Sequence, residues 1–239
     1  MRKILAALAL LGLAACGSEG PNGPDQSAGG FFTGQLTPSG AASPDDITAL
    51  IDETGFGFVY DEAGSTYYMV QTRPDGRLLA GDFRAYAPGV AAVNGTLSGT
   101  ITEHNTVTGF ATSSRGNEAF TIAYQAVAYE QPSSYLLVAG SFQYIDTVGA
   151  ATVTLNISGT GAITGGDSNG CTFTGQMSIP DSRFNAYRID GVQQCTGLPD
   201  QTLSGLATYA PQDGATPPLL LVGLSDGAEF ATVALAQKL

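Results

Sequence analysis

Basic residues are scarce in this sequence of 239 residues. Nine lysines and arginines stand against 21 aspartates and glutamates, so the formal net charge is −12 at pH 7. A surface of this sign repels the phosphates of nucleic acids and the anionic headgroups of lipids. The charge balance therefore excludes nucleic acid as a partner, and any attachment to a membrane must come from something other than a basic patch.

Histidine is almost absent, since His104 is the single copy. It stands between Glu103 and Asn105 in a predicted turn, where a lone histidine is most often a solvated surface group. Without a second histidine the common metal-ligand sets cannot be completed. We therefore expect no metal site and no cofactor.

Cysteine is also rare, with Cys16, Cys171 and Cys195 as the three copies. The last two are the pair left to form a bond in an oxidising compartment. A zinc site is the alternative, but two cysteines with no histidine nearby make a poor ligand set. We therefore predict a disulfide between Cys171 and Cys195, which would close a loop of about 25 residues.

Long apolar runs are missing except near the start of the chain. Arg2 and Lys3 precede an apolar run from residue 4 to residue 13, followed by two alanines and Cys16. The run is too short to span a bilayer. A basic start, a short apolar run and small residues are typical of a secretory signal peptide, which we predict over residues 1–15.

The residues Leu13-Ala14-Ala15-Cys16 resemble the lipobox of bacterial lipoproteins. This resemblance implies a diacylglyceryl thioether on Cys16, cleavage before it and acylation of the new N-terminus. Loss of residues 1–15 leaves seven basic against 21 acidic residues, a net charge of −14. The acyl chains, not charge, would therefore hold the protein on the membrane. Gly17 stands where an aspartate favours retention at the inner membrane, so the resemblance implies an outer-membrane location, at the periplasmic face or the cell surface.

Residues 16–30 contain glycine, proline and polar residues without a large apolar anchor, so they predict a lipidated flexible tether. Beyond them, short apolar runs are interrupted every ten residues or so by glycine, proline, asparagine or aspartate, which is typical of antiparallel β structure. The 32 glycines suit tight turns and barrel bends. We predict an all-β chain of two small barrels of about eight strands each, over residues 31–130 and 131–239.

One segment is ambiguous. Ser43-Pro44-Asp45-Asp46 is a good helix start, and Ile47, Leu50 and Ile51 follow at helical spacing. The same stretch also alternates as a strand does, and its C-terminal neighbours are predicted strands. We favour the strand.

The second half carries a further resemblance, to uncharacterised lipoproteins of Gram-negative bacteria. It consists of the strand Gly-Cys-Thr-Phe-Thr-Gly at residues 170–175, an Asn-x-Tyr strand at residues 185–187, a second cysteine and a Ser-Gly-Leu-Ala strand at residues 204–207. Two small β domains behind a lipidated cysteine are also similar in architecture to factor H binding protein and to the lobes of transferrin-binding protein B. These resemblances imply a fold and a location, and no activity.

Ser168 is the strongest catalytic candidate, because residues 166–170 satisfy the pattern Gly-x-Ser-x-Gly. A nucleophile elbow requires a helix after the serine. Here Cys171 begins a predicted strand, so we interpret the motif as a turn. The acidic candidates match no calcium loop, and we expect them to form a solvated acidic face; they are Asp45, Asp46, Asp52, Glu53, Asp61, Glu62, Asp181 and Asp226.

These observations predict a non-enzymatic lipoprotein of the outer membrane with a binding or structural role. Its partners would be the membrane, through the anchor, and a protein of the envelope or of a host. The alternative is a calycin-like carrier whose hollow barrel holds a small apolar ligand, lined by Phe58, Tyr60, Met69 and Val70. An enzyme would need Ser168 or an acidic pair to act. A porin-like barrel is disfavoured because the strands lack an aromatic girdle.

Overall fold

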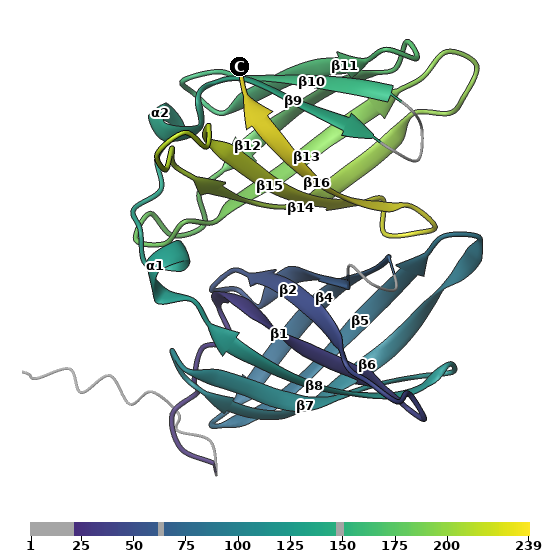
Figure 1. Cartoon of the computed structure of the whole chain (residues 1–239), viewed down its shortest axis with the longest axis vertical. Helices are drawn as coiled ribbons and strands as arrows, with labels where there is room; N and C mark the ends of the chain where they lie inside the picture. Colours follow the sequence, from purple (N-terminus) through teal and green to yellow (C-terminus); the bar gives the residue numbers. More distant parts are fainter. Residues whose placement is uncertain (1–21, 62–64, 147–150) are drawn as a thin grey trace, which may run out of the picture.

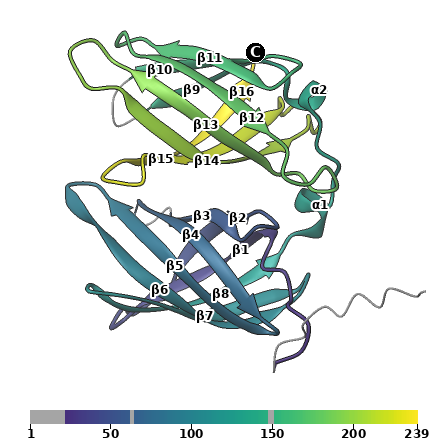
Figure 2. The same ribbon diagram turned by 180° about the vertical axis from the view of Figure 1, so that it is seen from behind.

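The computed structural model describes residues 22–61, 65–146 and 151–239, and shows two closed barrels of eight antiparallel strands, stacked on each other (Figures 1 and 2). The predicted all-β fold of two barrels is therefore confirmed. The first barrel consists of β1 (Gly30–Pro38), β2 (Asp45–Ile51), β3 (Phe56–Asp61), β4 (Thr66–Asp75), β5 (Leu78–Ala87), β6 (Val90–Thr102), β7 (Thr106–Ser113) and β8 (Gly116–Tyr124).

A linker with two short helices, α1 (Ala126–Tyr129) and α2 (Tyr135–Val138), leads to the second barrel. Neither helix is long and apolar enough to cross a membrane, within the part of the chain that is described. The second barrel consists of β9 (Gly140–Asp146), β10 (Ala151–Ile157), β11 (Ala162–Asp167), β12 (Thr172–Ser178), β13 (Tyr187–Gln194), β14 (Gln201–Ala210), β15 (Leu219–Ser225) and β16 (Ala231–Lys238).

In both barrels every second residue of a strand points into the interior, because successive residues of a strand point to opposite faces of the sheet. Strand β2 shows how this resolves the ambiguous segment. Ile47, Ala49 and Ile51 are buried in the first barrel, and β2 pairs with β1 along seven residues. The strand prediction is confirmed, since the sheet needs this face and a helix could not supply the pairing.

Tight turns join consecutive strands, and some of them require glycine. Gly76 has φ +59° between β4 and β5, and Gly170 has φ +91° between β11 and β12. A residue with a side chain is strained at such angles. These turns keep consecutive strands adjacent, so each barrel is a simple up-and-down meander closed by its first and last strands.

The predicted disulfide between Cys171 and Cys195 is present. Strands β12 and β13 pair with Thr172 opposite Gln194. Extending this register by one step places Cys171 opposite Cys195, so the bond ties two neighbouring strands together at their ends.

Candidate functional site

The N-terminal segment lies across one mouth of the first barrel. Cys16 is outside the described residues, but from residue 22 onward the chain contacts the turns at this mouth. The side-chain amide of Asn22 donates to Asp75 at 2.8 Å, and the backbone N–H of Gln26 donates to the carbonyl of Gly76 at 2.8 Å. Ala28 is 3% exposed and closes the interior beneath it. Residues 22–29, expected to be flexible, are therefore fixed to the barrel.

Two glutamates strengthen this docking. The backbone N–H of Ser27 donates to Glu103 at 3.1 Å, and the Ser27 hydroxyl donates to Glu53 at 2.5 Å. The side-chain oxygen of Gln26 accepts in turn from the backbone N–H of Glu103 at 3.1 Å. The segment is thus bound to three turns of the barrel, those near residues 53, 76 and 103.

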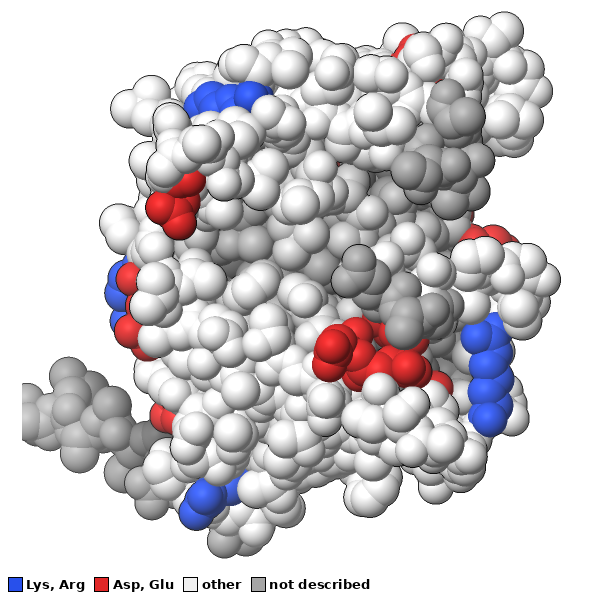
Figure 3. Space-filling view, viewed as in Figure 1, with Lys and Arg blue, Asp and Glu red and all other residues white. Residues whose placement is uncertain are grey.

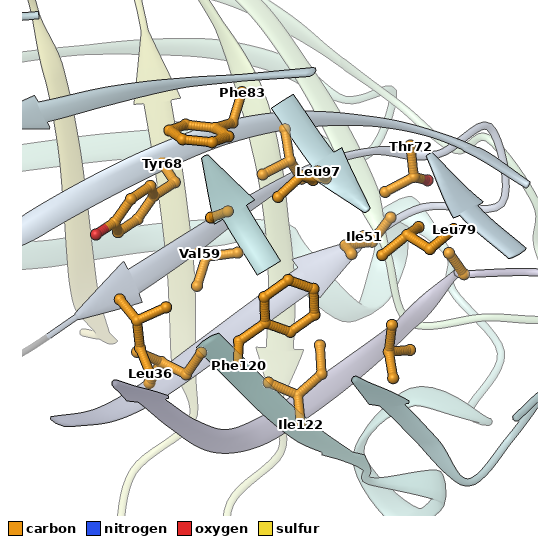
Figure 4. A pocket seen from close by; sticks show the side chains of 15 residues that line it. Leu36, Ile51, Val59, Tyr68, Thr72, Leu79, Phe83, Leu97, Phe120 and Ile122 are labelled. Carbon is orange, nitrogen blue, oxygen red and sulfur yellow. The ribbon is translucent and has the colours of Figure 1, made fainter. Parts of the chain in front are cut away.

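The interior of the first barrel holds a small apolar cavity of about 50 Å³ (Figure 4). Pockets for small-molecule ligands are usually roughly 300–1,000 Å³. In this structure the cavity has no room for a ligand of that size. Its wall is formed by inward side chains that include Val59, Tyr68, Val70, Leu79, Phe83 and Phe120.

The predicted lining of a ligand cavity is wrong for three of its four residues. Val70 lines the cavity, but Phe58, Tyr60 and Met69 do not. Val59 points inward, so Phe58 and Tyr60 on either side of it point outward, and Met69 points outward next to Val70. The sequence showed that these residues alternate, but it did not show which set faces the barrel axis.

The opposite mouth of this barrel carries a buried tyrosine and a carboxyl group. The Tyr68 hydroxyl donates to Glu118 at 3.1 Å. Burial raises the pKa of Glu118 above its ordinary value, and the nearby Asp61 carboxylate raises it further, against the hydrogen bond from Tyr68. Burial also raises the pKa of the Tyr68 hydroxyl. Both effects favour the uncharged forms of the pair.

The two barrels and the linker between them meet in a joint. Its core is an apolar cluster to which both barrels and the linker contribute, with Leu50 and Phe58 from the first barrel, Tyr129 from α1 and Leu206 from the second barrel. Phe58 is 1% exposed although it points away from its own barrel. A Cβ placed on Gly223 of the second barrel would lie 2.4 Å from the Phe58 ring, so glycine is required for this approach.

An ion pair between a buried carboxylate and a partly exposed arginine crosses the joint. Arg188 Nη2 of β13 donates to Asp52 Oδ2 at 2.6 Å and to the Thr54 hydroxyl at 2.8 Å. The guanidinium also lies 5.1 Å from the centre of the Phe56 ring. Asp52 is 1% exposed, and its other oxygen accepts from the backbone N–H and the hydroxyl of Thr54. The sequence-based expectation of a solvated Asp52 is wrong, and Arg188 was missed because no local pattern marks a pair 136 positions apart.

Further contacts hold the other side of the joint. The Ser225 hydroxyl donates to the Tyr86 oxygen at 2.7 Å, and Arg84 Nε donates to the carbonyl of Ala228 at 2.6 Å. Glu229 accepts from the backbone N–H of Ala92 at 3.1 Å. The joint therefore has a buried apolar centre and polar contacts on both sides.

Ser168 and His104 are not brought together. Ser168 lies in the turn between β11 and β12 of the second barrel, where its hydroxyl accepts from the backbone N–H of Thr152 at 3.1 Å. His104 lies in a turn of the first barrel, stacked on Tyr124 at 5.1 Å between ring centres. A strand and not a helix follows Ser168, as the sequence predicts. The motif is a turn without a base.

The remaining acidic candidates make local contacts and do not form a common site among the described residues. Asp181 pairs with Arg183, which lowers the pKa of that carboxyl. Asp226 has a lowered pKa, because hydrogen bonds from the backbone of Phe230 and from Gln201 outweigh its burial. Asp61 is buried, contrary to the expectation of a solvated group. No group of three potential ligands that could hold a metal ion occurs in the described part of the chain, and Glu62 falls outside it.

Comparison with known proteins gives only distant structural likeness. No family model matches the sequence, and no curated protein matches it. A candidate outer membrane protein from Bacteroides fragilis matches with a TM-score of 0.29 and 13% identity over 88% of this chain and 97% of its own. Isotype 1 transferrin-binding protein B from serogroup B Neisseria meningitidis matches with a TM-score of 0.28 and 10% identity over 82% of this chain and 63% of its own. At these values the likeness extends to neither mechanism nor partner.

Proposed function

We propose that this chain is a non-enzymatic lipoprotein of the outer membrane, anchored through Cys16, whose two barrels form a rigid unit for binding another protein. The observation that carries the proposal is the lipobox-like stretch at residues 13–16, followed closely by a segment fixed to the first barrel from Asn22.

In this proposal, the few residues between Cys16 and the first barrel determine which barrel lies near the membrane. Six steps separate Cys16 from Asn22, and an extended chain covers at most about 20 Å over that length. The chain enters at the foot of the first barrel, at the end of the molecule away from the second barrel (Figures 1 and 2). The first barrel would then lie near the lipid, and the second barrel would be presented outward.

The chemistry of the described residues favours binding over the alternatives. Ser168 lies in a turn of the second barrel whereas His104 lies in the first, and the buried carboxylate of Asp52 is engaged by Arg188. The cavity of about 50 Å³ also gives little support to the carrier hypothesis. What remains is a rigid surface of two barrels and their loops, which is how scaffolds of this kind bind proteins.

Labelling with radioactive palmitate tests the anchor. The expressed full-length protein should incorporate label and remain with the membrane fraction, whereas Cys16→Ser should lose both properties. Cys171→Ala combined with Cys195→Ala is the matched control, since it removes the other two cysteines, which form a disulfide, and should keep the label. Absence of label in the wild-type protein, or unchanged membrane association of Cys16→Ser, would overturn the proposal.

A further inference from the structure

The first barrel meets the second through one of its walls. Strand β14 lies against β2 and β3, and β16 lies against β4. Because the eight strands of the closed barrel follow one another in sequence order, β7 stands diametrically opposite β3. Figures 1 and 2 both show β7 at the end of the molecule away from the second barrel. Strands β6, β7 and β8 thus form a wall that faces away from the joint, which we call the outer wall.

The outer wall presents a regular array of uncharged side chains. On β7, Val107 and Ala111 point into the interior, so the alternate residues point outward. The register aligns these outward residues with those of β6 and β8 in three rows, which are Thr96–Thr112–Asn117, Ser98–Phe110–Ala119 and Thr100–Thr108–Thr121. Every residue of the array is neutral, although the chain has a net charge of −12. Figure 3 shows the surface over β7 and β8 as largely white, with charged side chains toward its borders.

An aromatic ring stands at the centre of this array. Phe110 is 54% exposed, and its neighbours in the row, Ser98 and Ala119, are too short to cover the ring. Leu78 on β5 is 50% exposed and lies beside the array, opposite Thr100. Aromatic and leucine side chains are typical of protein surfaces that lie in the interfacial region of a bilayer. The short neutral residues around Phe110 would let it reach such a surface without the desolvation of a charge.

The segment that leads to Cys16 is fixed at one end of the outer wall. The backbone N–H of Ser27 donates to Glu103, and the backbone N–H of Glu103 donates to the side-chain oxygen of Gln26, both at 3.1 Å. Glu103 stands in the turn between β6 and β7, which are two strands of this wall. The six steps from Asn22 to Cys16 cover at most about 20 Å. An anchor at Cys16 would therefore keep the outer wall close to the lipid.

We infer that the outer wall of the first barrel rests on the membrane surface, with Phe110 and Leu78 at the level of the lipid headgroups. A protein surface with the net charge of this chain is repelled by anionic headgroups, whereas the neutral array can approach them without that repulsion. The anchor makes the encounter intramolecular, so a weak contact through one ring and short neutral side chains is enough to orient the molecule. The inference rests on the proposed anchoring and names the part of the first barrel that faces the lipid.

The second barrel supplies a matched control surface. Asn156, Thr164 and Thr174 point outward in one uncharged row across β10, β11 and β12. This row contains no aromatic residue, and it belongs to the barrel that does not bind residues 22–29. A charge introduced at Thr174 changes the net charge of the protein as much as one introduced at Ser98. The two positions therefore separate contact with the membrane from a general effect of charge.

A fluorescent reporter tests the contact. The chain contains no tryptophan, so Phe110→Trp places a single indole at the centre of the outer wall. The chain from Cys16 onward is coupled through that thiol to a maleimide phospholipid, in vesicles of phosphatidylcholine and phosphatidylglycerol; the other two cysteines form the disulfide. We expect the emission to shift to shorter wavelength, and to be quenched when brominated phosphatidylcholine replaces the ordinary lipid. Phe230→Trp, in the turn between β15 and β16, is the control and should show neither change.

Charge variants in the Phe110→Trp background complete the test. Ser98→Glu places a carboxylate beside the reporter and against the anionic headgroups, so the quenching should fall about five-fold. Thr174→Glu adds the same charge to the second barrel and should leave the quenching unchanged. Circular dichroism checks that each variant is folded.

Three outcomes would overturn the inference: no quenching of the coupled Phe110→Trp protein, equal quenching of Phe230→Trp, or undiminished quenching in folded Ser98→Glu. An emission shift without quenching by brominated lipid would also overturn it, and would identify a second copy of the chain as the occupant of the wall. Coupling at Cys16 supplies the anchor chemically, so a failure of palmitate labelling would leave these results unchanged. The anchor and the membrane contact of the outer wall are therefore tested separately.

Discussion

The two barrels have the same number of strands in the same order, yet they are completed by different means. The first is closed by seven residue pairs between its end strands and is covered at one mouth by residues 22–29. The second has two pairs at the corresponding position and a disulfide between β12 and β13 instead. The difference teaches that strand count alone does not determine closure. Two barrels with the same strand order can therefore be closed by ladders of different length.

Removing the disulfide should produce the largest difference between the barrels. Cys171→Ala with Cys195→Ala opens a loop that constrains the unfolded chain, and for this loop length we expect a loss of about 3.5 kcal/mol in the free energy of unfolding. Hydrogen exchange should show the loss in β9–β16, with β1–β8 unaffected. Equal loss of protection in both barrels would show that they unfold as one cooperative unit, and the comparison would then fail.

Breaking the ion pair should separate the barrels at their joint. Arg188→Met leaves the buried Asp52 carboxylate without its cation, which should cost about 3 kcal/mol in urea denaturation. Adding Asp52→Asn should recover part of this loss, because the amide oxygen can still accept from Thr54. Arg183→Met is the matched control at an exposed pair and should cause no measurable change. A similar effect of both arginine variants would contradict the structural role of the joint.

Filling the cavity should distinguish the two interiors. Val70→Ile adds a methylene next to the space in the first barrel and should stabilise the protein by about 0.5–1 kcal/mol. The same change at Val222, which is equally buried in the second barrel and outside this cavity, should cost about 1 kcal/mol through overpacking. Thermal unfolding measures both. Stabilisation by both substitutions, or by neither, would mean that the interiors are equally well packed.

The smallest effect concerns Glu118 at the far mouth of the first barrel. Its pKa is raised above the ordinary 4.5, first by burial, so the folded state holds this proton more tightly than the unfolded chain does. Stability should therefore fall as the pH rises from about 4.5 through the raised pKa, and stay at the lower level above it. Glu118→Gln should remove this decline and raise the melting temperature at pH 7 by about 1–2 °C, with little change at pH 4. An unchanged pH profile would contradict the assignment.

The architecture was accessible from the sequence because it depends on local signals. Turn residues every ten positions or so and alternating apolar residues predicted both barrels and the strand at Asp45–Ile51. The cysteine pair could be predicted because only two candidates remained. The sequence did not show which side of each strand faces the barrel interior. Phe58 and Met69 illustrate this: they point outward but are covered by the other barrel, so they are as apolar as residues of an interior.

The joint could not be predicted for a different reason. Asp52 and Arg188 are 136 positions apart and come together only when two complete barrels stack. The pair arises from how one barrel rests on the other, and no local pattern in the chain describes that arrangement.

The segment from Asn22 to Ala28 has a mechanical consequence. Its bonds to Glu53, Gly76 and Glu103 belong to turns from three different pairs of strands. A load applied at the N-terminus would be divided among these turns in shear, and would not peel β1 from the sheet one bond at a time. A protein tethered by its N-terminus would therefore withstand a pulling force without losing strand β1 from the first barrel.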